Sequence, residues 1–129
     1  MGHLPIPERD EELAHEVIGA AIEVHRVLGP GFLESVYEQA LIYELSLRNV
    51  PVERQRPIAV RYKEIEIPGQ RLDLLVDARV IVELKAVDDF APIHLAKTMS
   101  YMRTMDLRLG LMINFNVPLL KDGIRRVVL

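Results

Sequence analysis

The chain of 129 residues contains no cysteine and no tryptophan, and only 5% of its residues are aromatic. The absence of cysteine excludes disulfides, zinc sites with thiolate ligands, iron–sulfur clusters and a cysteine nucleophile. Any catalytic or metal-binding chemistry therefore depends on carboxylates, histidines and hydroxyl groups. The scarcity of aromatic residues also argues against tight nucleic-acid binding through base stacking by this chain alone.

The sequence also lacks a strong excess of charge and long apolar runs. Its formal net charge is −3, so binding a polyanion would require a local basic surface or a metal ion. Half of the residues are hydrophobic, but no apolar run approaches the roughly 18 residues that would suggest a membrane span. The N-terminal residues show no apolar signal-peptide core. We expect a soluble cytoplasmic protein that does not associate with membranes.

The length predicts a single domain that spans residues 1–129. Three segments have helical periodicity: residues 8–28, 32–48 and 92–106. Five segments have the alternating or β-branched composition of strands: residues 52–67, 72–76, 80–85, 107–115 and 124–129. We expect Gly29-Pro30-Gly31 to separate the first two helices, a bulge or break in the first strand at Pro57, and a turn at Pro68-Gly69. The predicted order is α-α-β-β-β-α-β-β, an α/β or α+β domain.

The predicted hairpin that ends at Lys85 carries the most informative residues. Its three-residue loop pairs positions whose numbers add to 156, which places Asp73 opposite Glu83, with Lys85 two residues along the same face. The other face, which includes Leu72 and Leu74, is wholly apolar. Two carboxylates that face each other across a sheet repel, and more strongly when buried, so the arrangement requires a compensating cation.

The compensating cation is either Lys85 or a divalent metal ion. Two carboxylates provide the hard oxygen ligands that suit Mg²⁺ or Mn²⁺. This donor set indicates metal-assisted phosphodiester hydrolysis, in which Lys85 orients or activates the attacking water. The alternative is an ordinary salt bridge on the solvent face of the hairpin. The apolar neighbours Leu75 and Ile81 on the same face favour a covered site.

Several motifs, in the correct order, resemble the GxxExxY protein family. Residues 31–37 fit the pattern G-x-x-E-x-x-Y, and residues 21–25, 82–87 and 110–115 also look like segments of that family. The similarity covers nearly the whole chain from about Ile18 onward. It implies membership of the PD-(D/E)XK nuclease-like superfamily. A restriction-endonuclease-like core, with a mixed central β-sheet flanked by helices, is then expected.

The resemblance implies roles for individual residues. Asp73 would be the first acid of the superfamily, Glu83 and Lys85 its E-x-K pair, and Glu34 an additional acid that completes the metal site or orients water. His25 occupies a position similar to a metal-binding histidine of related nucleases. Helix dipoles provide an alternative explanation, because they favour an acid such as Glu34 in a first turn and a histidine such as His25 near a C-terminus. Packing at the edge of the apolar stripe of its helix is a further alternative for His25.

Three further residues are candidate substrate contacts: Tyr37, Lys97 and Tyr101. Lys97 and Tyr101 stand where related nucleases have a Q-x-x-x-Y helix motif, and this spacing places them one turn apart. Lysine therefore replaces the expected glutamine, which either assists phosphate binding or alters the activity. Tyr37 is alternatively a core aromatic residue with its hydroxyl at the surface.

Two functions remain open from the sequence. The first is a nuclease or phosphodiesterase that depends on Mg²⁺ or Mn²⁺, hydrolyses DNA or RNA, and binds nucleic acid weakly by itself. The second is a catalytically inactive interaction module with a nuclease fold, acting as a homodimer or with a protein partner. The intact set of four candidate catalytic residues argues against a complete loss of catalysis.

Overall fold

The computed structural model describes residues 4–129, and the first three residues of the N-terminal stretch considered above lie outside it. Helices α1 (Glu8–Leu28) and α2 (Glu34–Leu47) precede three strands, β1 (Val52–Tyr62), β2 (Ile65–Val76) and β3 (Val80–Lys85). Helix α3 (Pro92–Met105) is followed by β4 (Leu109–Asn114), the 3-10 helix η1 (Leu120–Gly123) and β5 (Ile124–Val128). The predicted order of helices and strands is confirmed.

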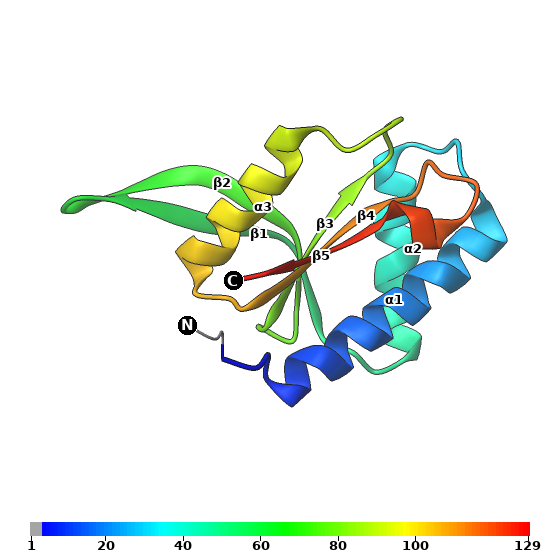
Figure 1. The fold of residues 1–129 in the computed structure, drawn as a ribbon, viewed down its shortest axis with the longest axis horizontal. Helices are drawn as coiled ribbons and strands as arrows, with labels where there is room; N and C mark the ends of the chain where they lie inside the picture. Colours follow the sequence, from blue (N-terminus) through cyan, green and yellow to red (C-terminus); the bar gives the residue numbers. More distant parts are fainter. Residues whose placement is uncertain (1–3) are drawn as a thin grey trace.

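The five strands form one mixed sheet in the order β1-β2-β3-β4-β5. β3 and β4 are parallel, and the other neighbouring strands are antiparallel. Helix α3 lies on one face of the sheet, and α1 and α2 lie on the other (Figure 1). The ends of β1 and β2 project past the helices as a two-stranded arm (Figure 1). This architecture is the expected α+β fold, consistent with a restriction-endonuclease-like core.

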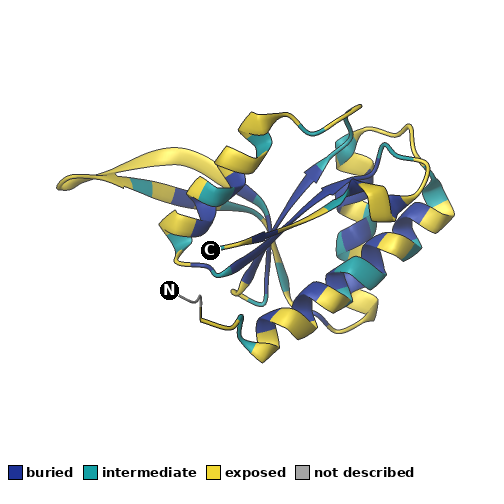
Figure 2. Ribbon diagram, in the orientation of Figure 1, coloured by how far each residue is buried: buried dark blue, intermediate teal, exposed yellow. Residues whose placement is uncertain are grey.

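Each face of the sheet has its own hydrophobic core, and the central strands are buried on both sides (Figure 2). Alternate residues of β3 divide between the two cores: Val82 and Leu84 pack toward α1 and α2, whereas Ile81 packs toward α3. Leu75 also belongs to the core under α3. The predicted covering of the face that carries Leu75 and Ile81 is confirmed. Among residues 4–129, no helix is both long enough and apolar enough to span a bilayer.

The predicted turn at Pro68-Gly69 is wrong. β2 continues through these residues, and the chain reverses at residues 63–64 instead. The register explains the difference, because Ile58 pairs with Gln70 and Val60 pairs with Ile67. One residue of β1 therefore faces two residues of β2, Pro68 and Gly69, which form a β-bulge. β1 continues through Pro57, which pairs with Arg71, so the bulge or break expected at Pro57 is not found there, and the register shifts between Ile58 and Val60 instead.

The predicted position of Leu72 on the same face as Leu74 is also wrong. Leu74 packs against α1 and α2, whereas Leu72 packs under α3. Side chains two residues apart share a face only in a regular strand. The pairing of β1 with β2 is interrupted at Asp73, between the pairs made by Leu72 and Leu74, so the regular alternation does not hold there.

Candidate active site

Asp73 and Glu83 lie side by side at the end of the β2–β3 ladder. The paired residues of this ladder have the predicted sum of 156 and end at Leu74 and Val82, so Asp73 and Glu83 occupy the next position. The backbone N–H of Asp73 donates to Oε1 of Glu83 at 3.4 Å. The N–H of Leu84 donates to Oδ2 of Asp73 at 2.8 Å. Where the regular pairing of β2 with β3 stops, side-chain oxygens thus accept hydrogen bonds from backbone N–H groups.

Glu83 is a buried carboxylate beside a second carboxylate. Only 5% of the residue is exposed, and alternation places it on the same side of β3 as Ile81, toward α3. Burial raises the pKa of Glu83, and the charge and side-chain hydrogen bond of Asp73 raise it further, whereas the backbone N–H of Asp73 and the charge of Lys85 lower it. Without a cation, the pair therefore favours a proton on Glu83.

Glu34 adds a third carboxylate, close enough to Asp73 for their charges to interact. It is the first residue of α2 and is partly buried. Burial raises the pKa of Glu34, as does the charge of Asp73, whereas Lys85 and Lys97 lower it. The start of α2, the end of β3 and helix α3 thus bring acidic and basic side chains to one region.

The turn between α1 and α2 sets the position of Glu34. Gly29 has a φ of 68°, in the left-handed region that glycine adopts most easily. Tyr37, which is fully buried, donates its hydroxyl to the carbonyl of Gly29 at 2.6 Å and accepts the N–H of Phe32 at 3.2 Å. Its ring stacks on Phe115 at a centroid distance of 4.5 Å. The structure therefore gives Tyr37 a role in fixing this turn.

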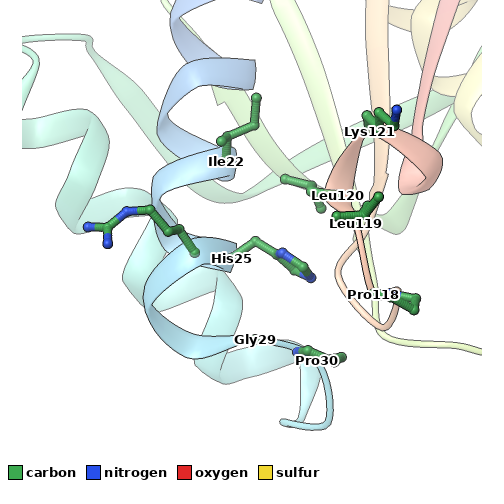
Figure 3. A pocket seen from close by; sticks show the side chains of 9 residues that line it. Ile22, His25, Gly29, Pro30, Pro118, Leu119, Leu120 and Lys121 are labelled. Atoms are coloured by element: carbon green, nitrogen blue, oxygen red, sulfur yellow. The ribbon is translucent and has the colours of Figure 1, made fainter.

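His25 contacts a loop rather than the carboxylate pair. Its Nε2 lies 2.7 Å from the carbonyl oxygen of Val117. Because a carbonyl only accepts hydrogen bonds, Nε2 carries a proton in this contact and is not a free metal ligand. In Figure 3 the ring of His25 points from α1 toward the segment that begins at Pro118. His25 and residues 118–121 line a pocket of about 450 Å³ together with the apolar side chain of Ile22.

Lys97 and Tyr101 line a second pocket, of about 360 Å³, between α3 and the β1–β2 arm. Tyr101 is buried and donates its hydroxyl to Oε1 of Gln70 at 2.7 Å. The Nζ atom of Lys97 lies 5.6 Å from the centre of the Tyr101 ring. Lys97 is exposed, so its ammonium group is accessible from solvent, and its charge lowers the pKa of Glu34.

Sequence reasoning missed His94, which also belongs to this region. Nδ1 of His94 accepts the N–H of Ala91 at 3.0 Å and caps the first turn of α3. Burial lowers the pKa of His94, and the charges of Lys85 and Lys97 lower it further. Its place in a turn that starts with Pro92 is a sequence signal for a helix cap, but the proximity to Lys85 depends on the tertiary fold.

The carboxylate pair has suitable donors for a hard divalent cation. Two carboxylates, one of them buried with a raised pKa, offer oxygen ligands and negative charge that a cation would neutralise. In residues 4–129, no group of three or more histidine, aspartate or glutamate side chains forms a preassembled metal site. Glu34 and His25 therefore do not complete such a cluster with Asp73 and Glu83.

Comparison with known proteins identifies the family. A family model described as the PD-(D/E)XK nuclease superfamily matches residues 11–127. The comparisons with curated proteins and with solved structures gave no match. The matched segment includes the sheet up to Val127 and the carboxylates of Glu34, Asp73 and Glu83. Because the match covers most of the chain, the protein belongs to the PD-(D/E)XK nuclease superfamily.

Proposed function

We propose that the protein is a metal-dependent nuclease of the GxxExxY type, which hydrolyses phosphodiester bonds in DNA or RNA. The observation that carries the proposal is the contact between Asp73 and buried Glu83, whose pKa is raised by burial and by Asp73. A strongly shifted carboxylate with a specific charged neighbour is typical of functional sites. Superfamily membership supports nuclease chemistry. The cytoplasmic location expected from the sequence belongs to the same proposal.

In this proposal Asp73 and Glu83 hold Mg²⁺ or Mn²⁺. When bound, the cation supplies Lewis-acid stabilisation of the negative charge that develops on the phosphate group. Glu34, whose pKa is raised by burial and by Asp73, accepts a hydrogen bond from the attacking water and orients it. His25, whose Nε2 donates to Val117, has no part in this scheme.

The lysines supply positive charge on the substrate side. Lys85, at the end of β3, donates a hydrogen bond to the attacking water or to a phosphate oxygen and so stabilises the transition state. Lys97 lies over Tyr101 and is exposed, which suits contact with a neighbouring phosphate. Its charge replaces the uncharged amide expected from the Q-x-x-x-Y pattern. The hydrogen bond from Tyr101 to Gln70 fixes the wall against which Lys97 packs.

A second candidate function, a protein interaction module, is favoured by the surface of the projecting arm. Tyr62 pairs with Ile65, and Val60 pairs with Ile67, so these four side chains lie on one face of the arm. Tyr62, Ile65 and Ile67 are each at least 45% exposed. Exposed apolar side chains in a row favour contact with a second copy or a protein partner.

A cleavage panel distinguishes the two functions. Single-stranded DNA, duplex DNA, branched DNA and RNA are incubated with the protein and Mg²⁺, Mn²⁺ or EDTA. We expect cleavage of at least one substrate with metal, and a loss of roughly 10²-fold or more in Asp73→Asn. Asp77→Asn, which changes a turn residue paired with Arg9, is the matched control and retains activity.

Absence of cleavage from the whole panel would contradict the nuclease proposal. The interaction module then predicts that the protein self-associates or binds a partner through the arm. Ile65→Lys places a charge on that surface, and sedimentation analysis would show dissociation of an oligomer in this variant but not in Leu119→Lys, which alters a different exposed apolar side chain.

A further inference from the structure

The strand pairing is interrupted on both sides of Asp73. In the β1–β2 register, Arg54 pairs with Leu74 and Arg56 pairs with Leu72, but the intervening position has no pair. The β2–β3 register also ends before Asp73. The residue of β1 that would face Asp73 is Gln55, and it has a φ of 49°. Gln55 is therefore in the left-handed region, which is unfavourable for a residue with a side chain.

The interruption changes the face on which each strand packs. Before it, Val52 of β1 packs against the core under α1 and α2, and after it Ile58 belongs to the core under α3. β2 makes the same change between Leu74 and Leu72. In a regular strand, residues separated by an even number of positions lie on the same face. Where such residues lie on opposite faces, the backbone between them is irregular. Gln55 and Asp73 are where both strands become irregular.

A buried carboxylate holds Gln55 in this conformation. Glu38 of α2 is only 6% exposed, and its Oε2 accepts the side-chain amide of Gln55 at 2.9 Å. Its Oε1 accepts Nε of Arg54 at 2.6 Å. The side chain of Gln55 thus points toward α2, although regular alternation after Arg54 would direct it toward α3.

We propose that Glu38 is a positioning residue for the carboxylate site. By holding Gln55 in the left-handed conformation, Glu38 keeps Asp73 out of the β1–β2 ladder and leaves its carboxylate against the backbone N–H of Leu84, beside Glu83. The link to catalysis rests on the proposed nuclease function. The link to the position of Asp73 does not, and it is measured separately.

Hydrogen exchange at the Leu84 amide reports the position of Asp73, because this N–H donates to Oδ2 of Asp73. The Val82 amide is the internal reference, since Val82 pairs within the regular ladder. In Glu38→Ala we expect exchange at Leu84 to accelerate by roughly tenfold relative to Val82, as for the loss of one hydrogen bond. Gln55→Gly added to this variant restores protection, because glycine adopts a positive φ without support.

The matched control is Asp10→Ala. Asp10 is a buried carboxylate paired with an exposed arginine, Arg79, just as Glu38 is paired with Arg54. Its removal lowers the overall stability but leaves the ratio of the Leu84 and Val82 exchange rates unchanged. An equal change of that ratio in Asp10→Ala would mean that any loss of stability loosens Leu84, which would overturn the proposal.

A second pair of variants tests the proposal even if Glu38→Ala does not fold. Gln55→Ala and Gln55→Gly both remove the contact with Glu38, but only glycine tolerates the left-handed conformation. We expect Leu84 to lose protection in Gln55→Ala and to keep it in Gln55→Gly. Equal protection in the two variants, or no rescue of Glu38→Ala by Gln55→Gly, would overturn the positioning role.

Mn²⁺ titration of the same variants tests the link to the site. We expect Glu38→Ala to bind Mn²⁺ at least roughly tenfold more weakly than the wild type and Gln55→Gly to restore the affinity. If the wild type binds no Mn²⁺, the proposed nuclease function fails, while the exchange measurement still decides whether Glu38 positions Asp73. Unchanged Mn²⁺ affinity in a Glu38→Ala protein that has lost Leu84 protection would overturn the link to the site.

Discussion

The backbone amide of Asp73 donates to the side chain of Glu83 across the end of the β2–β3 ladder, at 3.4 Å. The contact orients the carboxylate of Glu83 through the backbone N–H of Asp73, the residue that carries the second carboxylate. Burial and the charge of Asp73 raise the pKa of Glu83, so the folded protein without metal holds a proton there more tightly than the unfolded chain does. This relationship underlies the first prediction.

Glu83→Gln is expected to stabilise the metal-free protein at neutral pH. The folded-state pKa of Glu83 lies above its ordinary value of 4.5, so stability is greatest below that value and falls as the pH rises toward the folded-state pKa. Glutamine does not titrate, so it removes this dependence of stability on pH, and we expect it to raise the unfolding free energy by roughly 1–3 kcal/mol at pH 8. Urea unfolding in EDTA from pH 5 to pH 9 measures the effect. An identical slope in wild type and variant, with exposed Glu66→Gln as control, would contradict it.

Lys85→Met is expected to separate catalysis from metal binding. Lys85 supplies positive charge to the reacting phosphate or water but is not a ligand, so cleavage falls by roughly 10²-fold or more while Mn²⁺ affinity changes little. Cleavage rates and Mn²⁺ titrations of the same preparation provide the comparison. Lys121→Met, at an exposed lysine of η1, is the control. A variant that cleaves at the wild-type rate would remove Lys85 from the mechanism.

Tyr37→Phe is expected to affect folding rather than substrate binding. The buried hydroxyl donates to Gly29 and accepts from Phe32, and its loss should lower the unfolding free energy by about 1–2 kcal/mol. Exposed Tyr43→Phe is the control and changes little. Denaturation and cleavage kinetics measure the two effects. A raised KM with unchanged stability would instead support the substrate contact suggested by the family resemblance.

His25→Ala is expected to reduce stability by roughly 1–3 kcal/mol without changing Mn²⁺ affinity, because it leaves the carbonyl of Val117 without its side-chain donor. His25→Gln, whose amide also donates, should recover part of the loss. Thermal unfolding and Mn²⁺ titration distinguish the two roles. Weaker Mn²⁺ binding in both variants would show that His25 acts as the metal ligand that the resemblance implies.

The fold could be predicted from the sequence where local signals and tertiary packing agree. The apolar spacing of residues 8–28 and the stop at Gly29 gave the bounds of α1. Pro68-Gly69 is an equally strong local turn signal, but a bulge opposite Ala59 accommodates both residues within β2. Short-range signals do not decide between a turn and a bulge, because the partner strand makes that choice.

The candidate site divides in the same way. Alternation and the three-residue hairpin loop sufficed to bring Asp73 next to Glu83, because both lie on one local hairpin. The contact between Glu38 and Gln55 joins a helix to a strand, and no periodicity in the sequence indicates it. The positive φ of Gln55 also has no local signal, since glutamine is not a residue that favours it. For this reason the sequence predicted the wrong face of the sheet for Leu72.

The most direct test of the central claim is calorimetric titration of the wild-type protein with Mn²⁺ at neutral pH, beside Asp73→Ala and the turn variant Asp77→Asn. If Asp73 and Glu83 form a metal site, the wild type and Asp77→Asn bind Mn²⁺ at millimolar concentrations or below, and Asp73→Ala does not. No binding by the wild type in this range, or equal binding by Asp73→Ala, would contradict the account.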